Sequence, residues 1–271
     1  MIAVFDFGIS NTDIAIFDNG NIDFFNFKTR LPIEENVLLE LLDKIKISSK
    51  DINCIGISGG KTKDFPNEIG EIRIIQVPEV EAIGRGAKKN FEIEDSFLAM
   101  SLGTGTGCIF GDKDNKYQYI GGIPVGGGTL IGLSKLLLNE TNIESISKLA
   151  NAGDRSAVDF LIKDVVSGID ILKPNLSASN FAKVSEGIHR KEDISKALTN
   201  MIGEIIGTVA FSNALIFQKE EIYFIGRTFL EPNVKSAIDE RLAIAGISGI
   251  YSSSLGFENC LGILDFIKEN Y

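Results

Sequence analysis

The sequence predicts an α/β protein with two related domains that face each other. Its 271 residues, 44% of them hydrophobic, are enough for one large core or two smaller ones. The order strand, glycine turn, strand, strand, helix begins at Met1 and begins again at Ser96. Such a repeat indicates a duplicated α/β unit, so we place the boundary in Glu92–Asp95, between domains of residues 1–92 and 93–271.

The first domain begins with a meander of antiparallel strands. Alternating apolar residues bounded by turn residues predict strands at Met1–Asp6, Asp13–Phe17 and Ile22–Phe27. Leucines at helical spacing then predict a helix between Pro32 and Ile45. The remaining elements are strands at Ile52–Ile57 and Ile72–Val77 and a helix that begins after Pro78.

The second domain repeats this pattern and adds helices. Its predicted strands are Ser96–Ser101, Cys108–Phe110, Tyr117–Ile120, Ile222–Ile225 and Ile247–Tyr251. Its predicted helices are one that follows Gly128, Ile143–Ala152, Ala157–Val166, Ile194–Phe217, Val234–Leu242 and Glu258–Ile267.

A glycine-rich loop stands at the centre of the second repeat. Five glycines lie between Gly121 and Gly128, directly before an apolar helix that opens at Thr129. Glycines let backbone N–H groups approach one point, and a helix N-terminus adds a partial positive charge, so an anion is the expected occupant. The alternative is a flexible turn between two core elements.

The net charge of -10 excludes two classes of partner. Long-range repulsion would oppose both nucleic acid and an anionic membrane surface. An anionic ligand must therefore be held by local amides, a few cations or a metal. No apolar run is expected to span a bilayer, and Asp6 comes too early for a signal peptide, so we expect a cytoplasmic protein.

The cysteines and the single histidine give no catalytic or metal signature. Cys54, Cys108 and Cys260 are far apart and lack CxxC spacing, which argues against disulfides and zinc. His189 lies in a polar stretch and is interpreted as a surface residue, which argues against a histidine-based triad.

Asp6 is the first candidate for chemistry, because it ends a buried strand directly before a tight turn. It could cap that turn through its own backbone. The functional alternative is a carboxylate that orients Mg²⁺, an ion that prefers oxygen ligands and keeps most of its waters. Gly103–Thr106 would supply amides and hydroxyls to the same phosphates from the other domain.

Glu79 and Glu81 open the helix after Pro78. Two carboxylates at a helix start often only complement the helix dipole. In a phosphotransferase, either could accept the proton of an attacking hydroxyl. Gly59–Thr62 is similar to the end of a P-loop, but Ile55 stands where that motif needs glycine, so we reject that interpretation.

Together these stretches resemble the acetate/sugar kinase, Hsp70 and actin superfamily, and within it the type II pantothenate kinases. Four stretches carry the resemblance, and it extends over nearly the whole chain through Gly153–Arg155, Leu176–Phe181, Tyr223–Gly226 and Gly256–Leu264. The four stretches are DFGIS (Asp6–Ser10) and SLGTGTG (Ser101–Gly107), which resemble the two phosphate motifs, EVEAIGRG (Glu79–Gly86), which resembles the segment of the catalytic glutamate, and GGIPVGGGTLIGLSKLL (Gly121–Leu137), which resembles the glycine-rich loop and its helix.

The resemblance implies two actin/hexokinase-like (ribonuclease H-like) domains with a nucleotide cleft between them and a helical insertion in the second. It implies an ATP- and Mg²⁺-dependent kinase that converts pantothenate to 4'-phosphopantothenate, the first step of coenzyme A synthesis, and a homodimer. The alternatives are a kinase of the same fold that acts on a sugar or N-acetylhexosamine, and a nucleotide-sensing ATPase.

The resemblance also implies residue roles. Glu79 would be the general base, and Asp6 would orient the metal. The expected phosphate and nucleotide ligands are Asp6, Gly8, Ser10, Asn11, Gly103, Thr104, Gly105, Gly126, Gly127, Gly128 and Thr129, with Gly226 and Arg227 near the adenosine. The expected acceptor-binding residues are Glu81 and Tyr119, and Arg155 and Lys61 are added as acceptor-binding candidates by their charge alone.

Three positions depart from the family pattern. Asp13 stands where the family has a lysine after the first phosphate motif, which removes a cation expected near the transferred phosphate. Tyr119 replaces an arginine that resembles a ligand of the acceptor carboxylate, and Asn259 replaces a glycine of the terminal motif.

Overall fold

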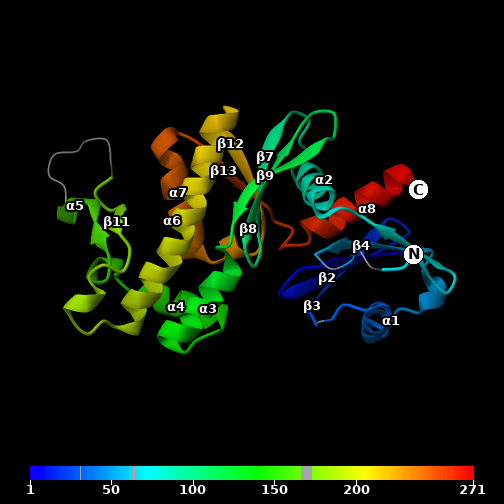
Figure 1. Ribbon diagram of the computed structural model, residues 1–271, viewed down its shortest axis with the longest axis horizontal. Coiled ribbons are helices and arrows are strands. Elements are labelled where there is room, and N and C mark those ends of the chain that lie inside the picture. Colours follow the sequence, from blue (N-terminus) through cyan, green and yellow to red (C-terminus); the bar gives the residue numbers. More distant parts are fainter. Residues whose placement is uncertain (31, 61, 63–64, 166–172) are drawn as a thin grey trace.

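A computed structural model shows a mixed α/β protein with two large sheets (Figure 1). It describes the chain except residues 31, 61, 63–64 and 166–172. The first sheet contains β1 (Ile2–Phe7), β2 (Asn11–Asp18), β3 (Asn21–Lys28), β4 (Cys54–Gly59), β5 (Glu68–Ile69) and β6 (Ile72–Gln76). The second contains β7 (Phe97–Leu102), β8 (Thr106–Gly111), β9 (Tyr117–Ile123), β12 (Glu221–Gly226) and β13 (Ser248–Tyr251).

The two sheets share one topology, as the sequence repeat predicts. Their strand orders are β3-β2-β1-β4-β6-β5 and β9-β8-β7-β12-β13. In each, the first strand pairs antiparallel with the second and parallel with the fourth. Gly59 and Gly226 end the parallel partners with φ of 110° and 96°, a conformation that favours glycine. The duplicated α/β fold is therefore confirmed.

Helices cover both sheets. They are α1 (Glu35–Lys44), α2 (Glu79–Phe91), α3 (Gly127–Leu138), α4 (Ile143–Ala152), α5 (Ile162–Val165), α6 (Lys191–Phe217), α7 (Pro232–Leu242) and α8 (Glu258–Asn270). Every predicted strand begins within two residues of an observed one. The short strands β5, β10 (Phe160–Leu161) and β11 (Ser177–Ser179) were not predicted.

The helix predicted at Ala157–Val166 is wrong for its described part. A 3-10 turn ends at Ala157, and β10 and the single-turn helix α5 follow. The amides of Ile162 and Lys163 donate to the carbonyls of Leu176 and Pro174. Because these amides donate to the segment at Pro174–Leu176, they do not form the hydrogen bonds of a helix.

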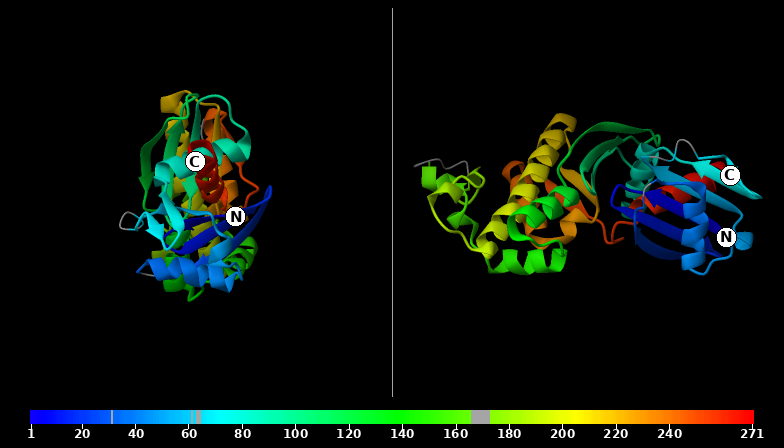
Figure 2. Two further views of the ribbon diagram at one scale, coloured as in Figure 1. Left: turned by 90° about the vertical axis from the view of Figure 1, so that its right-hand side faces the viewer. Right: turned by 60° about the horizontal axis from the view of Figure 1, so that its bottom comes forward.

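The last helix returns to the first sheet. In α8, Ile263 and Leu264 pack in one buried cluster with Val4 and Ala15 of β1 and β2, and Figure 2 shows α8 (red) against the blue sheet. In α2, by contrast, Ile83 packs against the second sheet. The chain therefore crosses between the sheets twice, and the division at residue 92 stays a prediction.

Helices α2 and α8 touch through glycines at the junction of the sheets. A Cβ atom on Gly262 would lie 1.9 Å from the Ala82 carbonyl oxygen, and one on Gly86 would lie 2.1 Å from the Glu258 carbonyl oxygen. The buried Arg85 of α2 adds ion pairs to Glu81 at 2.7 Å and, in α8, to Asp265 at 3.1 Å and to Glu269. Only glycine allows this backbone approach.

Helix α6 corrects the expectation that no apolar stretch is long enough for a bilayer. Its 27 residues meet the length and composition of a membrane span. One side of the helix is nevertheless buried in protein, where Leu198, Ile202 and Ile206 join the core cluster of the second sheet. Its apolar character is accounted for by this packing.

We expect Gly262→Ala to lower the free energy of unfolding by about 1–3 kcal/mol, because the new methyl group overlaps the backbone of α2. Urea unfolding measures the change. Gly132→Ala is the matched control, since a Cβ atom there meets nothing within 4 Å and should add roughly 0.5–1 kcal/mol. Equal stability of the two variants would contradict the glycine contact.

Candidate active site

Two glycine turns from different sheets meet at the centre of the molecule. The first joins β1 to β2, and the second joins β7 to β8. The Ser10 Oγ and Thr104 Oγ1 atoms are 2.9 Å apart, although the residues are 94 positions apart in the chain. The structure thus brings together the two predicted phosphate motifs, which face each other between the sheets.

The glycine-rich loop braces the second turn. The amides of Gly127 and Gly128 donate to the carbonyls of Gly103 and Thr104 at 2.9 and 3.0 Å. A Cβ atom on Gly126 would lie 2.8 Å from the Gly103 carbonyl oxygen. These glycines therefore allow close packing of the two loops, and two amides expected to face a phosphate are engaged within the protein.

Other donors of the second turn fit a bound phosphate. Among the described residues, the amides of Thr104 and Gly105 have no hydrogen-bond acceptor. A Cβ atom on Gly103 would meet only the Gly105 carbonyl oxygen, at 3.9 Å, so the backbone there is open. With the hydroxyls of Ser10 and Thr104, these amides supply the donors that a phosphate chain needs.

Two buried carboxylates stand directly opposite each other beside these turns. Asp6 of β1 is the register partner of Asp13 of β2, so both side chains lie on one face of the sheet. Asn259 Nδ2 donates to Asp6 Oδ2 at 2.9 Å. Arg227 holds both carboxylate oxygens of Asp13, at 2.7 and 2.9 Å, and Asn26 donates to it at 2.6 Å.

These surroundings set the charge of Asp6. The pKa of its carboxyl is raised to about 7, chiefly by burial. The negative charges of Asp13 and Glu79 act in the same direction, whereas the Asn259 hydrogen bond and the Arg227 charge act in the opposite direction. A cation placed beside Asp6 would favour the ionised carboxylate. The site is therefore built to gain from a bound metal.

The donor chemistry fits Mg²⁺. Asp6 Oδ2 accepts from Asn259, and its Oδ1 atom accepts no hydrogen bond within the described chain. No three acidic, histidine or cysteine side chains of the described residues gather closely enough to hold a metal alone. This is consistent with an ion held by one carboxylate, water and substrate phosphates.

Glu79 and Glu81 differ in their surroundings. Glu79 is exposed as the first residue of α2, and its charge acts on Asp6. Glu81 Oε1 accepts from Arg85 Nε at 2.7 Å. Because Arg85 already occupies the Glu81 carboxylate, Glu79 is the better candidate for proton transfer.

Arg155, one of the acceptor candidates, is not close to Glu79. Arg155 donates to Ser177 of β11 at 2.7 Å and to the Asn175 carbonyl, and β11 lies at the far end of the molecule from α2 (Figure 1). Tyr119 is 55% exposed on the edge strand β9. Lys61 lies outside the described residues.

Three residues of the site had no assigned role in the sequence analysis. Asp13 and Asn259 appeared there only as departures from a pattern. Glu258 is 1% exposed, and its Oε2 atom accepts the Gly226 amide at 3.3 Å. Hairpin pairing in the sequence could have placed Asp13 opposite Asp6. No local sequence pattern predicts that α8, which carries Glu258 and Asn259, lies beside them.

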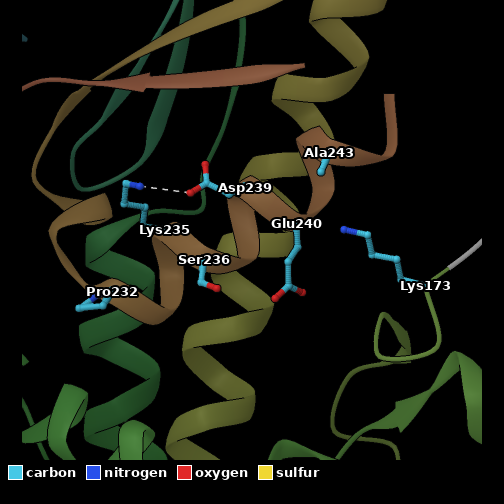
Figure 3. Close-up of a pocket in the computed structure, with 7 residues that line it drawn as sticks. All are labelled: Lys173, Pro232, Lys235, Ser236, Asp239, Glu240 and Ala243. Atoms are coloured by element: carbon cyan, nitrogen blue, oxygen red, sulfur yellow. Dashed lines mark hydrogen bonds and ion pairs between the residues drawn. The ribbon is translucent and has the colours of Figure 1, made fainter. Parts of the chain in front are cut away.

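A groove of about 420 Å³ lies elsewhere, between α7 and the segment at Lys173 (Figure 3). Lys235 and Asp239 form an ion pair of 3.2 Å on its wall. The groove is lined by Lys173, Pro232, Lys235, Ser236, Asp239, Glu240 and Ala243. None of these is among the predicted site residues.

The fold defines the class of protein. The activator of 2-hydroxyisocaproyl-CoA dehydratase from Clostridium difficile, solved with ADPNP, has a TM-score of 0.63 at 14% identity and covers 100% of this chain and 98% of its own. A ROK family glucokinase from Streptomyces griseus, solved with glucose and AMPPNP, has a TM-score of 0.60 at 15% identity over 99% of each chain. The chain therefore has the two-domain fold of the sugar kinases and actin-like ATPases.

Sequence similarity then gives the family. The family model described as Fumble matches residues 87–239. A type II pantothenate kinase from Bacillus cereus is 34% identical over 220 residues, which are 76% of this chain and 79% of that protein. The chain belongs to the Fumble family, the family of the type II pantothenate kinases.

We expect Asp6 to make the ligand-free protein less stable as the pH rises. Because its folded pKa lies above the ordinary value of 3.8, stability present below about pH 4 is lost as the pH rises through about 7. Asp6→Asn should remove this loss, which is about 4 kcal/mol at most.

Chemical denaturation of both proteins between pH 4 and pH 8 measures the difference. Mg²⁺ with ATP should reduce the loss in the wild-type protein only. A constant difference between the proteins across this range would mean that Asp6 is not held in a buried, negatively charged setting.

Proposed function

We propose that this protein is an ATP-dependent kinase that phosphorylates pantothenate, giving 4'-phosphopantothenate, the first step of coenzyme A synthesis. The contact between the two phosphate motifs, with Asp6 and Glu79 beside it, carries the proposal. The similarity to a type II pantothenate kinase supports pantothenate as the acceptor.

Each residue has a role in the transfer. Glu79 accepts the proton of the primary hydroxyl of pantothenate. The hydroxyl oxygen then bonds to the γ-phosphorus of ATP, and the bond between that phosphorus and the ADP oxygen breaks. Asp6 would hold Mg²⁺. The hydroxyls of Ser10 and Thr104 bind the phosphates from both sheets. Mg²⁺, when bound, supplies positive charge to the phosphate oxygens.

The proposal also covers the metal, the adenosine contact, the oligomeric state and the cellular location. We expect Mg²⁺ as the metal, with Gly226 near the adenosine, and by the resemblance a homodimer in the cytoplasm. A net charge of -10 supports a small-molecule substrate over nucleic acid or an anionic membrane.

Tyr119 leaves room for a second candidate. An acceptor carboxylate needs a cation, and a phenol offers only a neutral hydrogen bond. A sugar or N-acetylhexosamine needs no such cation, so a kinase for one of these is the alternative acceptor assignment. A nucleotide-sensing ATPase would transfer phosphate to neither.

We expect Glu79→Gln to lower kcat by roughly two to four orders of magnitude with nearly normal nucleotide affinity, because the amide keeps the shape and removes the base. Coupled ADP-release assays and calorimetry measure the two effects. Glu81→Gln is the matched control and should cost less. The reverse order of the two variants would show that the wrong carboxylate was assigned.

We expect pantothenate to be phosphorylated, and Tyr119→Arg to leave its KM unchanged or lower it, because a restored cation adds binding energy only if no other residue has replaced it. The assay compares pantothenate, pantetheine, several sugars and N-acetylhexosamines. Turnover of a sugar and none of pantothenate would favour the alternative acceptor.

A further inference from the structure

Phosphoryl transfer between the two glycine turns would bring further negative charge beside two carboxylates, Asp6 and Asp13. Asp6 and Asp13 are opposite each other, and the charges of Glu79 and Asp13 both act on Asp6. A kinase needs cations that stabilise the transferred phosphoryl group. Arg227 is a cation whose charge acts on Asp6.

The Arg227 guanidinium has a fixed place. Its two Nη atoms donate to the two oxygens of Asp13, at 2.7 and 2.9 Å, and its carbon lies 5.1 Å from the centre of the Phe257 ring. Phe257 in turn stacks on Phe24 of β3 at 4.7 Å. A Cβ atom on Gly256 would lie 2.7 Å from the Arg227 side chain, so glycine leaves space for it.

The backbone of Arg227 is tied to the second phosphate turn. Its amide donates to the Leu102 carbonyl at 3.0 Å. The hydroxyl of Thr228 donates to the Leu102 and Gly103 carbonyls at 3.1 and 3.0 Å. The backbone of Arg227 therefore lies beside the second turn, and its guanidinium contacts β2, the strand that follows the first turn. The position of the guanidinium is thus fixed relative to both turns.

The pairing with Asp13 leaves donors available. A guanidinium carries five N–H groups, and a bidentate carboxylate occupies two of them. The side chain has no other hydrogen-bond partner within the described part of the chain, and it is 32% exposed. Three N–H groups can therefore meet an anion between the turns.

We propose that Arg227 is a catalytic residue that binds the transferred phosphoryl group in the transition state, and that Asp13 is the residue that positions it. The inference rests on the proposed kinase function. It gives Arg227 a role at the reacting phosphate in place of the adenosine role that the resemblance implies. The cation missing from position 13 is then supplied from the other sheet.

The test measures Arg227→Gln and Asp13→Asn against the wild-type protein. Arg227→Gln should lower kcat by about 10³-fold, and Asp13→Asn by about tenfold or more, because the guanidinium loses its charged partner. ADP affinity, measured by calorimetry, should change little in both. Affinity for Mg·ADP with aluminium fluoride and pantothenate, which mimics the transition state, should fall with kcat.

Controls separate positioning from general destabilisation. Lys235→Gln removes a cation from the distant groove and should leave kcat unchanged. Arg227→Lys keeps the charge without the bidentate grip and should fall between wild type and Arg227→Gln. Asp13→Glu should recover part of the activity that Asp13→Asn loses.

Two further outcomes are distinct. A wild-type protein that transfers no phosphoryl group to any acceptor would contradict the proposed function and, with it, the role of Arg227. An active wild-type protein whose Arg227→Gln variant keeps its kcat and its affinity for the aluminium fluoride complex would contradict only the role of Arg227.

Discussion

The structure depends on the opposition of two carboxylates, Asp6 and Asp13, across the first pair of strands. Like charges directly opposite in an antiparallel pair repel each other, and burial increases the cost. The compensating groups, Arg227 and Asn259, come from the other end of the chain. The repulsion between the two carboxylates of the first sheet is thus compensated only when the second sheet and α8 are in place. Folding of both parts is therefore coupled to assembly of the site.

Packing between α2 and α8 also couples the two parts of the molecule. Backbone contact at Gly86 and Gly262 leaves little freedom for the helices to slide. Glu79 and Glu258 begin these two helices, so the same contact sets the distance between the proposed proton acceptor, Glu79, and the segment that carries Asn259. Motion of the sheets about this junction would move both groups together, whereas Ser10 and Thr104 are joined only by hydroxyl contact.

The sequence predicted what local patterns encode. Alternating residues and glycine spacing placed the strands and both turns, because turn geometry depends on near neighbours. Asp13 was only a departure from a pattern, since its importance comes from register with Asp6. The partners Arg227 and Asn259 lie more than 200 residues away. The helix predicted at Ala157–Val166 is wrong because the amides of Ile162 and Lys163 donate to Leu176 and Pro174, outside the segment that was read as a helix. Arg155 was chosen by charge alone, and the structure engages it with Ser177.

The central claim is that the space between the two glycine turns binds a nucleotide with its metal. Titration calorimetry with a non-hydrolysable ATP analogue tests it most directly, with and without Mg²⁺, on the wild-type protein and on Asp6→Asn. The account predicts one bound nucleotide per chain, an affinity that rises with Mg²⁺, and loss of that rise in Asp6→Asn. Absence of binding to the wild-type protein in the presence of Mg²⁺ would contradict it.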